Sequence, residues 1–255
     1  MIQGKKGEVE AQKVTMSLLI LIVIVLVLAF FSARVFDWMT SKGDVESCRL
    51  SVVASGKISD VSLGISTLDL ECPRKTIVLS PESYTVDESE KDYASEDEED
   101  YSENVKQVFA DEMRECWYKM GEGEVDMFDD NILYGFDDIC VVCSHIEFEH
   151  PSEESVGNFA TYLQETAIPL SVQQQEGITY YNYIYRQSPI GECSQFSSTG
   201  NIGITNNGEI DTSKPYDILF KAHHYEFLGV DYQCNSILVG PTETIAQAGC
   251  DYTYS

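Results

Sequence analysis

The stretch ICVVCSHIEFE, residues 139–149, decides how we interpret the fold of this chain. β-Branched and aromatic side chains dominate it, and acidic segments flank it, which is typical of a β-strand. Before it, apolar side chains recur at spacings of three and four across residues 104–120. This spacing predicts an amphipathic helix that packs on the strand. On that helix we expect Asp111, Glu112 and Glu115 to face away from the core.

The segments that follow extend a mixed pattern of helices and strands. Residues 152–164 carry apolar side chains at helical spacing after an acidic first turn, which predicts a second helix. Residues 178–187 fit either a helix or a strand. The tail predicts two strands, at 216–230 and 235–250. The order of elements predicts an α+β domain over residues 104–255.

The part of the chain before this domain has two predicted regions. Residues 37–86 are expected to be strand-rich, because the stretches 51–72 and 75–86 alternate apolar with polar or small side chains. In residues 87–103, ten of seventeen side chains are acidic. Such a run usually stays solvated and predicts a linker or an exposed loop. Calcium binding is the alternative, although the run lacks the EF-hand spacing.

The cysteines predict a disulfide-stabilised domain. Their number is even, as in exported domains held by disulfides. The eight candidates are Cys48, Cys72, Cys116, Cys140, Cys143, Cys193, Cys234 and Cys250. Eight cysteines allow 105 pairings, so the sequence does not decide among them. We expect Cys48 to pair with Cys72 within the first strand-rich region, and Cys234 to pair with Cys250 between the last two strands.

A CxxC motif at Cys140 and Cys143, followed by His145, is the most site-like feature. Residues three apart on a strand point to opposite faces, so we expect this pair to bond with Cys116 and Cys193 rather than internally. Thiol redox catalysis would instead need a cysteine at a helix N-terminus. Zinc binding by Cys140, Cys143 and His145 is a second alternative, although a second ligand pair is absent. We predict no catalytic residue, no cofactor and no metal ligand.

An apolar segment near the N-terminus predicts membrane insertion. Between Lys13 and Arg34 lie twenty residues without a charge. At about 1.5 Å per residue, a helix from Met16 to Ala33 spans about 27 Å, close to the roughly 30 Å hydrocarbon core of a bilayer. Its Val, Leu, Ile and Phe side chains favour insertion by roughly 4–8 kcal/mol. We predict a transmembrane helix at residues 14–36 that contacts the lipid bilayer.

The orientation of this helix follows from its flanks. Lys5, Lys6 and Lys13 precede it, which favours a cytoplasmic tail at residues 1–13. All the cysteines follow it, which favours an oxidising compartment for the rest of the chain. A cleaved secretory signal is the main alternative, but its apolar region is normally about 7–15 residues long. We therefore expect a single-pass protein of the cell membrane with its C-terminal domain outside.

The stretch KKGEVEAQKV, residues 5–14, precedes this predicted anchor. It resembles the class III signal of archaeal type IV pilin-like proteins, in which a basic pair and a glycine precede a long hydrophobic helix. Lys5, Lys6 and Gly7 carry the resemblance, which ends with the hydrophobic segment. The resemblance implies processing near Gly7, a pilin-like subunit and an archaeal source. A plain signal-anchor with a short basic tail is the alternative.

The charge of the chain limits its partners. Acidic residues number 43 against 16 basic ones, a formal net charge of −27. Nucleic acids and anionic membrane surfaces would be repelled. Hydrolase, phosphate-binding and nucleotide-binding motifs are absent from the sequence. We expect a cell-surface protein that acts in binding or structural interaction with an unknown protein or envelope partner, or with its own kind. An envelope thiol oxidoreductase, a metal-binding protein and a pilin-like subunit are the alternatives.

Overall fold

The computed structural model describes residues 44–54, 72–93, 101–123, 125, 137–151, 155–169, 177–185, 203–204, 208–227, 230–245, 249–250 and 252–254. The chain divides into two compact units, Met1–Asp44 and Val45–Ser255, and the second is described here. Within the described ranges, no helix is long and apolar enough to cross a membrane. The predicted transmembrane helix at 14–36 and the signal-like stretch at 5–14 lie outside these ranges.

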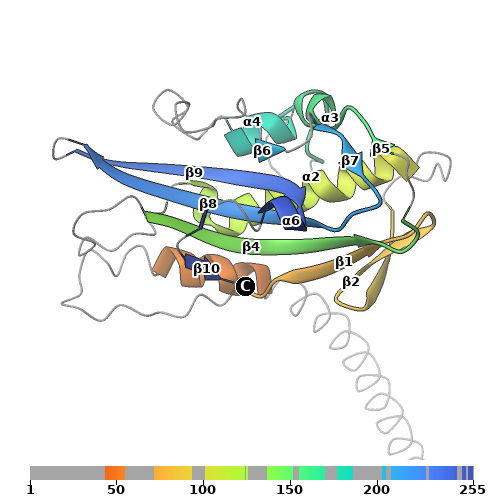
Figure 1. Cartoon of the computed structure of the whole chain (residues 1–255), viewed down its shortest axis with the longest axis horizontal. Helices are drawn as coiled ribbons and strands as arrows, with labels where there is room; N and C mark the ends of the chain where they lie inside the picture. The colour runs from red at the N-terminus through yellow and green to blue at the C-terminus, as the bar shows by residue number, and fades with distance from the viewer. Residues whose placement is uncertain are drawn as a thin grey trace, which may run out of the picture. The chain divides into compact units, whose positions relative to one another are not determined.

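A mixed β-sheet forms the centre of the second unit (Figure 1). Its strands follow the order β3-β2-β1-β4-β8-β9-β6, and β10 also pairs with β4. Their bounds are β1 Lys75–Leu79, β2 Ser83–Val86, β3 Ser89–Asp92, β4 Asp137–Phe148, β6 Gly203–Ile204, β8 Tyr216–Phe227, β9 Val230–Pro241 and β10 Tyr252–Tyr254. β4 pairs antiparallel with β8, and parallel with β1 and β10 along successive parts of its other edge. A separate pair joins β5 (Ser155–Val156) to β7 (Ile210–Asp211).

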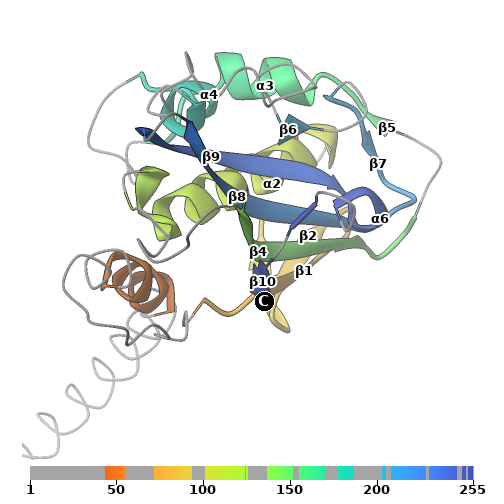
Figure 2. The same cartoon turned by 60° about the vertical axis from the view of Figure 1, so that its left-hand side comes forward.

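Three of the helices cover one face of the sheet in two layers. α2 (Tyr101–Lys119) packs against β4, β8 and β9, and α3 (Phe159–Glu165) and α4 (Tyr180–Tyr185) pack on α2 (Figure 2). We call the α2 side of the sheet the inner face. On the opposite, outer face, the short α6 (Thr242–Ile245) contacts β8 and β9.

The main core lies between α2 and the inner face. Trp117 and Phe109 of α2 are fully buried, and Phe109 makes an edge-on ring contact with Tyr216 of β8. A smaller apolar cluster on the outer face centres on Cys140, Leu219 and Ile245. The sheet is therefore buried on both faces, but the larger apolar area is under α2, where burial contributes most to stability.

These elements confirm the predicted mixed α+β fold. The helix predicted at 104–120 is α2, and the strand predicted at 139–149 is β4. The strands predicted within 75–86 are β1 and β2, and the ambiguous stretch 178–187 contains helix α4. The first strand of the tail, predicted at 216–230, is β8.

The prediction of short strands was wrong where 51–72 begins, because residues 44–54 form one helix. Cys48 and Val52 are both buried and lie four residues apart, which is the spacing of one helix face. Small and β-branched side chains gave the segment a strand-like composition, and tertiary packing overrides that propensity. The remainder, residues 55–71, lies outside the described ranges.

The prediction of an acidic linker at 87–103 was wrong at both ends. Residues 89–92 form strand β3, and α2 already begins at Tyr101. All four β3 side chains are exposed, so carboxylates remain in water while the backbone pairs with β2. The helix predicted at 152–164 also starts late, with β5 preceding α3, and the strand predicted at 235–250 ends in helix α6.

Candidate functional site

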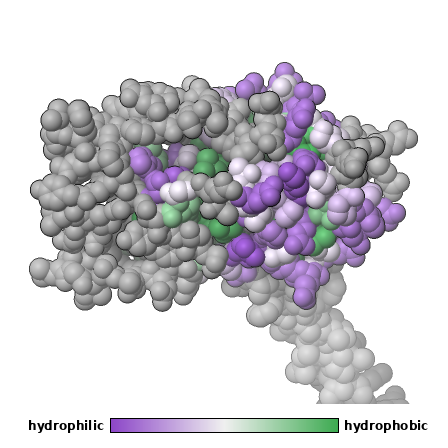
Figure 3. Space-filling model, in the orientation of Figure 1, coloured by the Kyte–Doolittle hydropathy of each residue, from purple (hydrophilic) through white to green (hydrophobic). Residues whose placement is uncertain are grey.

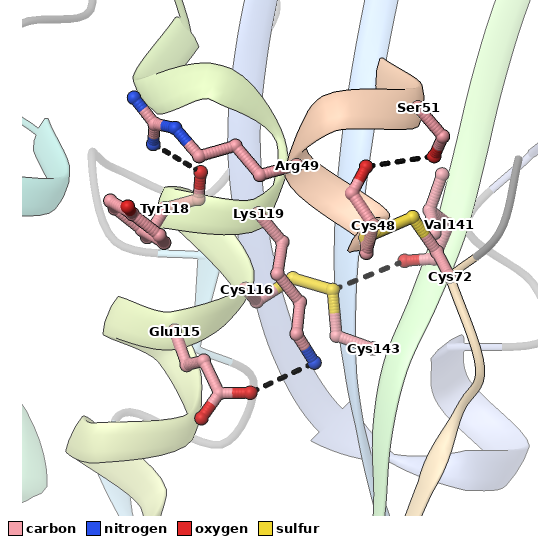
Figure 4. The surroundings of a disulfide bond; sticks show 10 residues. All are labelled: Cys48, Arg49, Ser51, Cys72, Glu115, Cys116, Tyr118, Lys119, Val141 and Cys143. Carbon is pink, nitrogen blue, oxygen red and sulfur yellow. Dashed lines mark hydrogen bonds and ion pairs between the residues drawn. A yellow bond between two sulfur atoms is a disulfide. The ribbon is translucent and has the colours of Figure 1, made fainter. Parts of the chain in front are cut away.

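Two disulfides reach β4 from opposite sides. Cys143 bonds to Cys116 of α2 on the inner face, and both side chains are buried (Figure 4). Cys140 bonds to Cys250, which lies just before β10, and belongs to the outer cluster. The prediction that Cys140 and Cys143 point to opposite faces and do not bond to each other is confirmed, as is the bond of one of them to Cys116.

A β-bulge in β4 sets which side chains face inward. Val142 pairs with Leu219, and Ser144 pairs with Ile218, which is adjacent to Leu219 in β8. Cys143 is therefore the extra residue of the bulge. A bulge of this kind shifts the alternation of faces by one residue. Cys143 and Ser144 therefore both point toward α2, and His145 points to the outer face. Without the bulge, His145 would lie under the helix.

Of the remaining cysteine predictions, one is confirmed and the others are wrong. The predicted bond between Cys48 and Cys72 is confirmed, and it joins the helix at 44–54 to the segment before β1. The predicted bond between Cys234 and Cys250 was wrong, because Cys250 pairs with Cys140. Cys234 is also disulfide-bonded. The expected bond between the CxxC motif and Cys193 was also wrong, because Cys140 and Cys143 pair with Cys250 and Cys116. Cys193 itself lies outside the described ranges. Cys250 pairs across a sequence separation of 110, which local strand patterns do not reveal.

This arrangement bears on the two chemical alternatives for the CxxC motif. Cys140 and Cys143 are in different disulfides, so the motif does not form the internal redox pair of a thiol oxidoreductase. Cys143 is also on the face opposite Cys140 and His145, so these three side chains do not converge on one ion. Within the described ranges, no group of three or more His, Cys, Asp or Glu side chains could hold a metal ion.

Charged side chains lie buried between α2 and the inner face. Glu112 accepts a hydrogen bond from the Ser144 hydroxyl, with 2.6 Å between the oxygens. The Nζ atom of Lys75 on β1 lies 2.5 Å from Glu115 and 3.5 Å from Glu112, and that of Lys119 lies 2.8 Å from Glu115. Two lysines and two glutamates thus form a charge-balanced network, drawn in part in Figure 4. We call it the inner ion network.

The expectation that the acidic side chains of α2 face away was wrong. Glu112 is buried under the helix, and Glu115 is largely covered. Asp111 points to the other side, where the Tyr180 hydroxyl of α4 donates a hydrogen bond to it at 2.8 Å. The sheet covers one side of α2 and the layer of α3 and α4 covers the other, so even the polar positions of the helix lie against protein.

Burial and lysine contacts shift the two inner pKa values in opposite directions. Burial raises the pKa of the Glu112 carboxyl, and Lys75 only partly offsets this. Burial also acts to raise the pKa of Glu115, but Lys75 and Lys119 lower it to about 2. The sign differs because Glu115 has two close cations, whereas Glu112 has one at 3.5 Å and a neutral hydroxyl. Glu115 is therefore the firmly ionised member of the inner ion network.

The helix at 44–54 is fixed to the C-terminal end of α2. The Arg49 guanidinium donates a hydrogen bond to the Tyr118 carbonyl at 2.6 Å and lies 4.0 Å from the centre of the Tyr118 ring (Figure 4). It also donates a hydrogen bond to Glu122 at 3.0 Å. The Tyr183 hydroxyl of α4 donates to the same Glu122 at 2.6 Å. Glu122, held at a φ of 58° between two glycines, thus joins the helix at 44–54 to α4.

Two histidine–carboxylate pairs lie on the outer face of β4 and β8. His145 lies opposite Asp217, with 2.6 Å between ring nitrogen and carboxylate, and its other nitrogen is 3.2 Å from Glu147. Asp138 lies opposite His223 and also pairs with Lys221 at 2.7 Å. Sequence reasoning missed both pairs, since each depends on the register between strands that are distant in sequence. Of the adjacent histidines, His223 faces outward, and the side chain of His224 lies outside the description.

Most basic side chains in the described ranges form ion pairs within the domain. Nine lysines and arginines lie in these ranges, and seven form ion pairs with carboxylates. These seven are Arg49, Lys75, Lys106, Arg114, Lys119, Lys214 and Lys221. The other two, Arg74 and Lys91, are exposed. The charge that remains at the surface is therefore dominated by carboxylates.

The exposed carboxylates are densest on the hairpin of β2 and β3. Glu82, Asp87, Glu88, Glu90 and Asp92 are all exposed there, against one lysine. Figure 3 shows hydrophilic residues gathered over the end of the molecule where β1 and β2 lie in Figure 1. Comparison with protein-family models, with curated proteins and with solved structures finds no match to this chain, so its geometry and charge carry the functional argument.

Proposed function

We propose that the chain is a single-pass membrane protein that presents an acidic, disulfide-bonded binding domain outside the cytoplasm. The apolar helix at 14–36 is its anchor, and residues 1–13 are its cytoplasmic tail. The partner is a protein or envelope component with positive charge, because an acidic surface repels nucleic acids and anionic lipid. The domain binds this partner through its surface and carries out no chemistry on it.

The state of the cysteines is the observation that carries this proposal. Every cysteine in the described ranges is disulfide-bonded. Disulfides persist in oxidising compartments outside the cytoplasm and are rare in a reducing cytosol. Their placement supports a structural role, since they join the helix at 44–54, α2 and the segment before β10 to the sheet. Such bonds stabilise an exported domain by restricting its unfolded chain.

The distribution of charge supports binding as the role of the domain. Inward-directed lysines and arginines neutralise the carboxylates of the inner ion network and of the helix ends. The surface carboxylates are left with few basic neighbours, which raises the negative potential around the domain. Such a potential attracts cationic partners and accelerates their association.

Epitope tags at the two ends of the full chain test this proposal. With one tag before Met1 and one after Ser255, antibody should bind the C-terminal tag on intact cells and the N-terminal tag only after permeabilisation. Both tags should sediment with membranes and resist carbonate extraction. Equal protection of both tags in intact cells, or recovery in the soluble fraction, would contradict the proposal.

The N-terminus of the mature protein tests the pilin-like alternative separately. Mass spectrometry of the full chain from membranes should find residues 1–13 present if the segment is a plain signal-anchor. Cleavage next to Gly7 would instead support processing of the kind found in type IV pilin-like proteins. The control is a Gly7→Val variant, which should have the same N-terminus as the wild type in the first case and lose cleavage in the second.

A further inference from the structure

We propose that β3 is a docking edge for an extended cationic segment of a partner protein, which would add to the sheet as a further strand. This inference rests on the proposed function and specifies the partner of the binding domain. β3 is a terminal strand of the sheet, and among the described strands it pairs only with β2. Its four residues, Ser89–Asp92, are all exposed.

The hairpin geometry leaves backbone groups of β3 available. Asp87 and Glu88 form a two-residue turn, both with positive φ, and Val86 pairs with Ser89 across it. In such a hairpin the pair next to the turn exchanges both hydrogen bonds, and alternate pairs do so thereafter. The amide and carbonyl groups of Glu90 and Asp92 therefore point away from β2. A peptide strand could hydrogen-bond to them, as in recognition by strand addition.

The side chains of the same two residues select the charge of the added strand. Glu90 and Asp92 are two residues apart, so their carboxylates lie on one face of β3. Opposite charges in cross-strand positions stabilise a pair of strands, and like charges destabilise it. A segment with lysine or arginine at alternate positions would place cations opposite both carboxylates. Lys91 points to the other face and does not oppose this contact.

The same carboxylates exclude one competitor, which is a second copy of this chain. Two copies joined through β3 would bring Glu90 and Asp92 of each strand close to those of the other. Charged side chains on edge strands prevent this kind of self-association in natural sheets. The acidic hairpin therefore favours a cationic strand over its own kind, and charge complementarity identifies the occupant.

Peptide binding to the full chain in a non-ionic detergent tests the proposal. The probe is a fluorescent peptide that alternates lysine with valine, and fluorescence anisotropy at physiological salt reports its binding. The matched control peptide has the same sequence with an N-methyl group at every residue, which removes the backbone donors of both edges and keeps the charge. We expect the methylated peptide to bind at least about tenfold more weakly. Equal binding of the two peptides would overturn strand addition.

Charge-matched variants locate the binding site. The variant E90K/D92K should lose at least about tenfold in affinity. The variant E165K/E209K should stay within about twofold of wild type, because Glu165 and Glu209 are exposed and lie outside the β2–β3 hairpin. Equal loss in both variants would show general attraction to an acidic surface and overturn the docking edge. Because this assay uses purified protein, its failure leaves the topology result of the epitope tags intact, and the reverse also holds.

A second pair of variants separates backbone pairing from charge. Glu90→Gln removes the charge and keeps the amide, whereas Glu90→Pro removes both the charge and the outward N–H, and a proline is tolerated on an edge strand. We expect E90P to weaken binding at least about fivefold more than E90Q. Indistinguishable affinities would contradict hydrogen bonding through Glu90. Circular dichroism of each variant confirms that the fold is retained.

Discussion

The two faces of β4 carry similar residue types in different surroundings. On the inner face, Ser144 meets Glu112 in a network closed off by α2. On the outer face, His145 meets Asp217 and the exposed Glu147. The bulge at Cys143 decides which residue belongs to which face. The difference lies in what the charges join: inner charges hold α2 to the sheet, whereas the outer histidine–carboxylate pairs join neighbouring strands, and of these outer groups only Glu147 is exposed.

The disulfides give the largest expected contrast between the faces. The outer Cys140–Cys250 bond spans a sequence separation of 110, and the inner Cys116–Cys143 bond spans 27. Because a longer loop restricts the unfolded chain more, C140A/C250A should lower the free energy of unfolding by about 4–5 kcal/mol and C116A/C143A by about 3–4 kcal/mol. Urea unfolding measures both. A larger loss from the inner pair would show that native packing outweighs loop length.

Lys75→Met should be the next most damaging change. It leaves Glu112 buried without its nearest cation and removes one of the two cations beside Glu115. Breaking a buried ion pair from one side costs about 3–5 kcal/mol, and we expect the lower end because the Lys75 side chain is 18% exposed. The control is Lys91→Met on exposed β3, which should change stability by less than about 0.5 kcal/mol. Similar losses in both variants would remove the inner ion network as a source of stability.

Acid should weaken the inner ion network through Glu115. Its folded pKa, about 2, lies below the roughly 4.3 of an unfolded glutamate. A depressed pKa stabilises the fold above the unfolded value, and this stabilisation is lost as the pH falls from about 4.3 toward 2. Comparing wild type with Glu115→Gln at pH 6 and pH 3, we expect the variant to lose less on acidification, by on the order of 2 kcal/mol. If wild type and variant lose the same free energy of unfolding between pH 6 and pH 3, Glu115 is not the group whose ionisation stabilises the fold.

Ser144→Ala tests the inward direction set by the bulge. The variant removes the hydroxyl that donates to the Glu112 carboxylate at 2.6 Å. A hydrogen bond to a charged group contributes about 1.5–3 kcal/mol, and we expect a loss of about 1.5–2 kcal/mol in thermal or urea unfolding. The double variant S144A/E112Q should lose less than the sum of the two single variants, because both remove the same contact. Additive losses would indicate that the two side chains act independently.

The smallest effect is expected on the outer face. The Glu147 side chain is 54% exposed and lies 3.2 Å from His145. Exposed ion pairs contribute little, because water screens them and the long side chain loses entropy. Glu147→Gln should therefore change the free energy of unfolding by at most about 0.5 kcal/mol at pH 6. A loss as large as that of S144A would erase the distinction between the faces.

Local patterns in the sequence predicted the centre of the fold. The strand at 139–149 and the helix at 104–120 follow from residue composition and apolar spacing, which depend on near neighbours. Local patterns did not predict the helix at 44–54, because Cys48 and Val52 are buried by elements far along the chain. Local patterns did not predict strand β3 either, because its acidic composition indicated a solvated loop.

The arrangement of the candidate site residues was harder to predict than the fold, because it depends on contacts between residues that are distant in sequence. Apolar spacing in α2 identified the side that faces the sheet, but it carries no information about α3 and α4 on the other side. The contact of Asp111 with α4 therefore could not be predicted. The burial of Glu112 could not be predicted either, because it depends on Ser144 and Lys75 of distant strands. The short-range bond between Cys48 and Cys72 was predictable, whereas the partner of Cys140 was not, because it lies at the end of the chain.

The Cys48–Cys72 bond has a mechanical consequence if the chain is anchored as proposed. Tension between a membrane anchor and a bound partner would enter the domain at the helix at 44–54 and pass through the two sulfur atoms to the segment before β1. The 23 positions between the cysteines would carry none of it. Those positions could otherwise extend by about 80 Å when stretched. The bond thus shortens the part of the chain that carries the force. A pull on the partner would then reach the membrane without first unfolding the residues between the two cysteines.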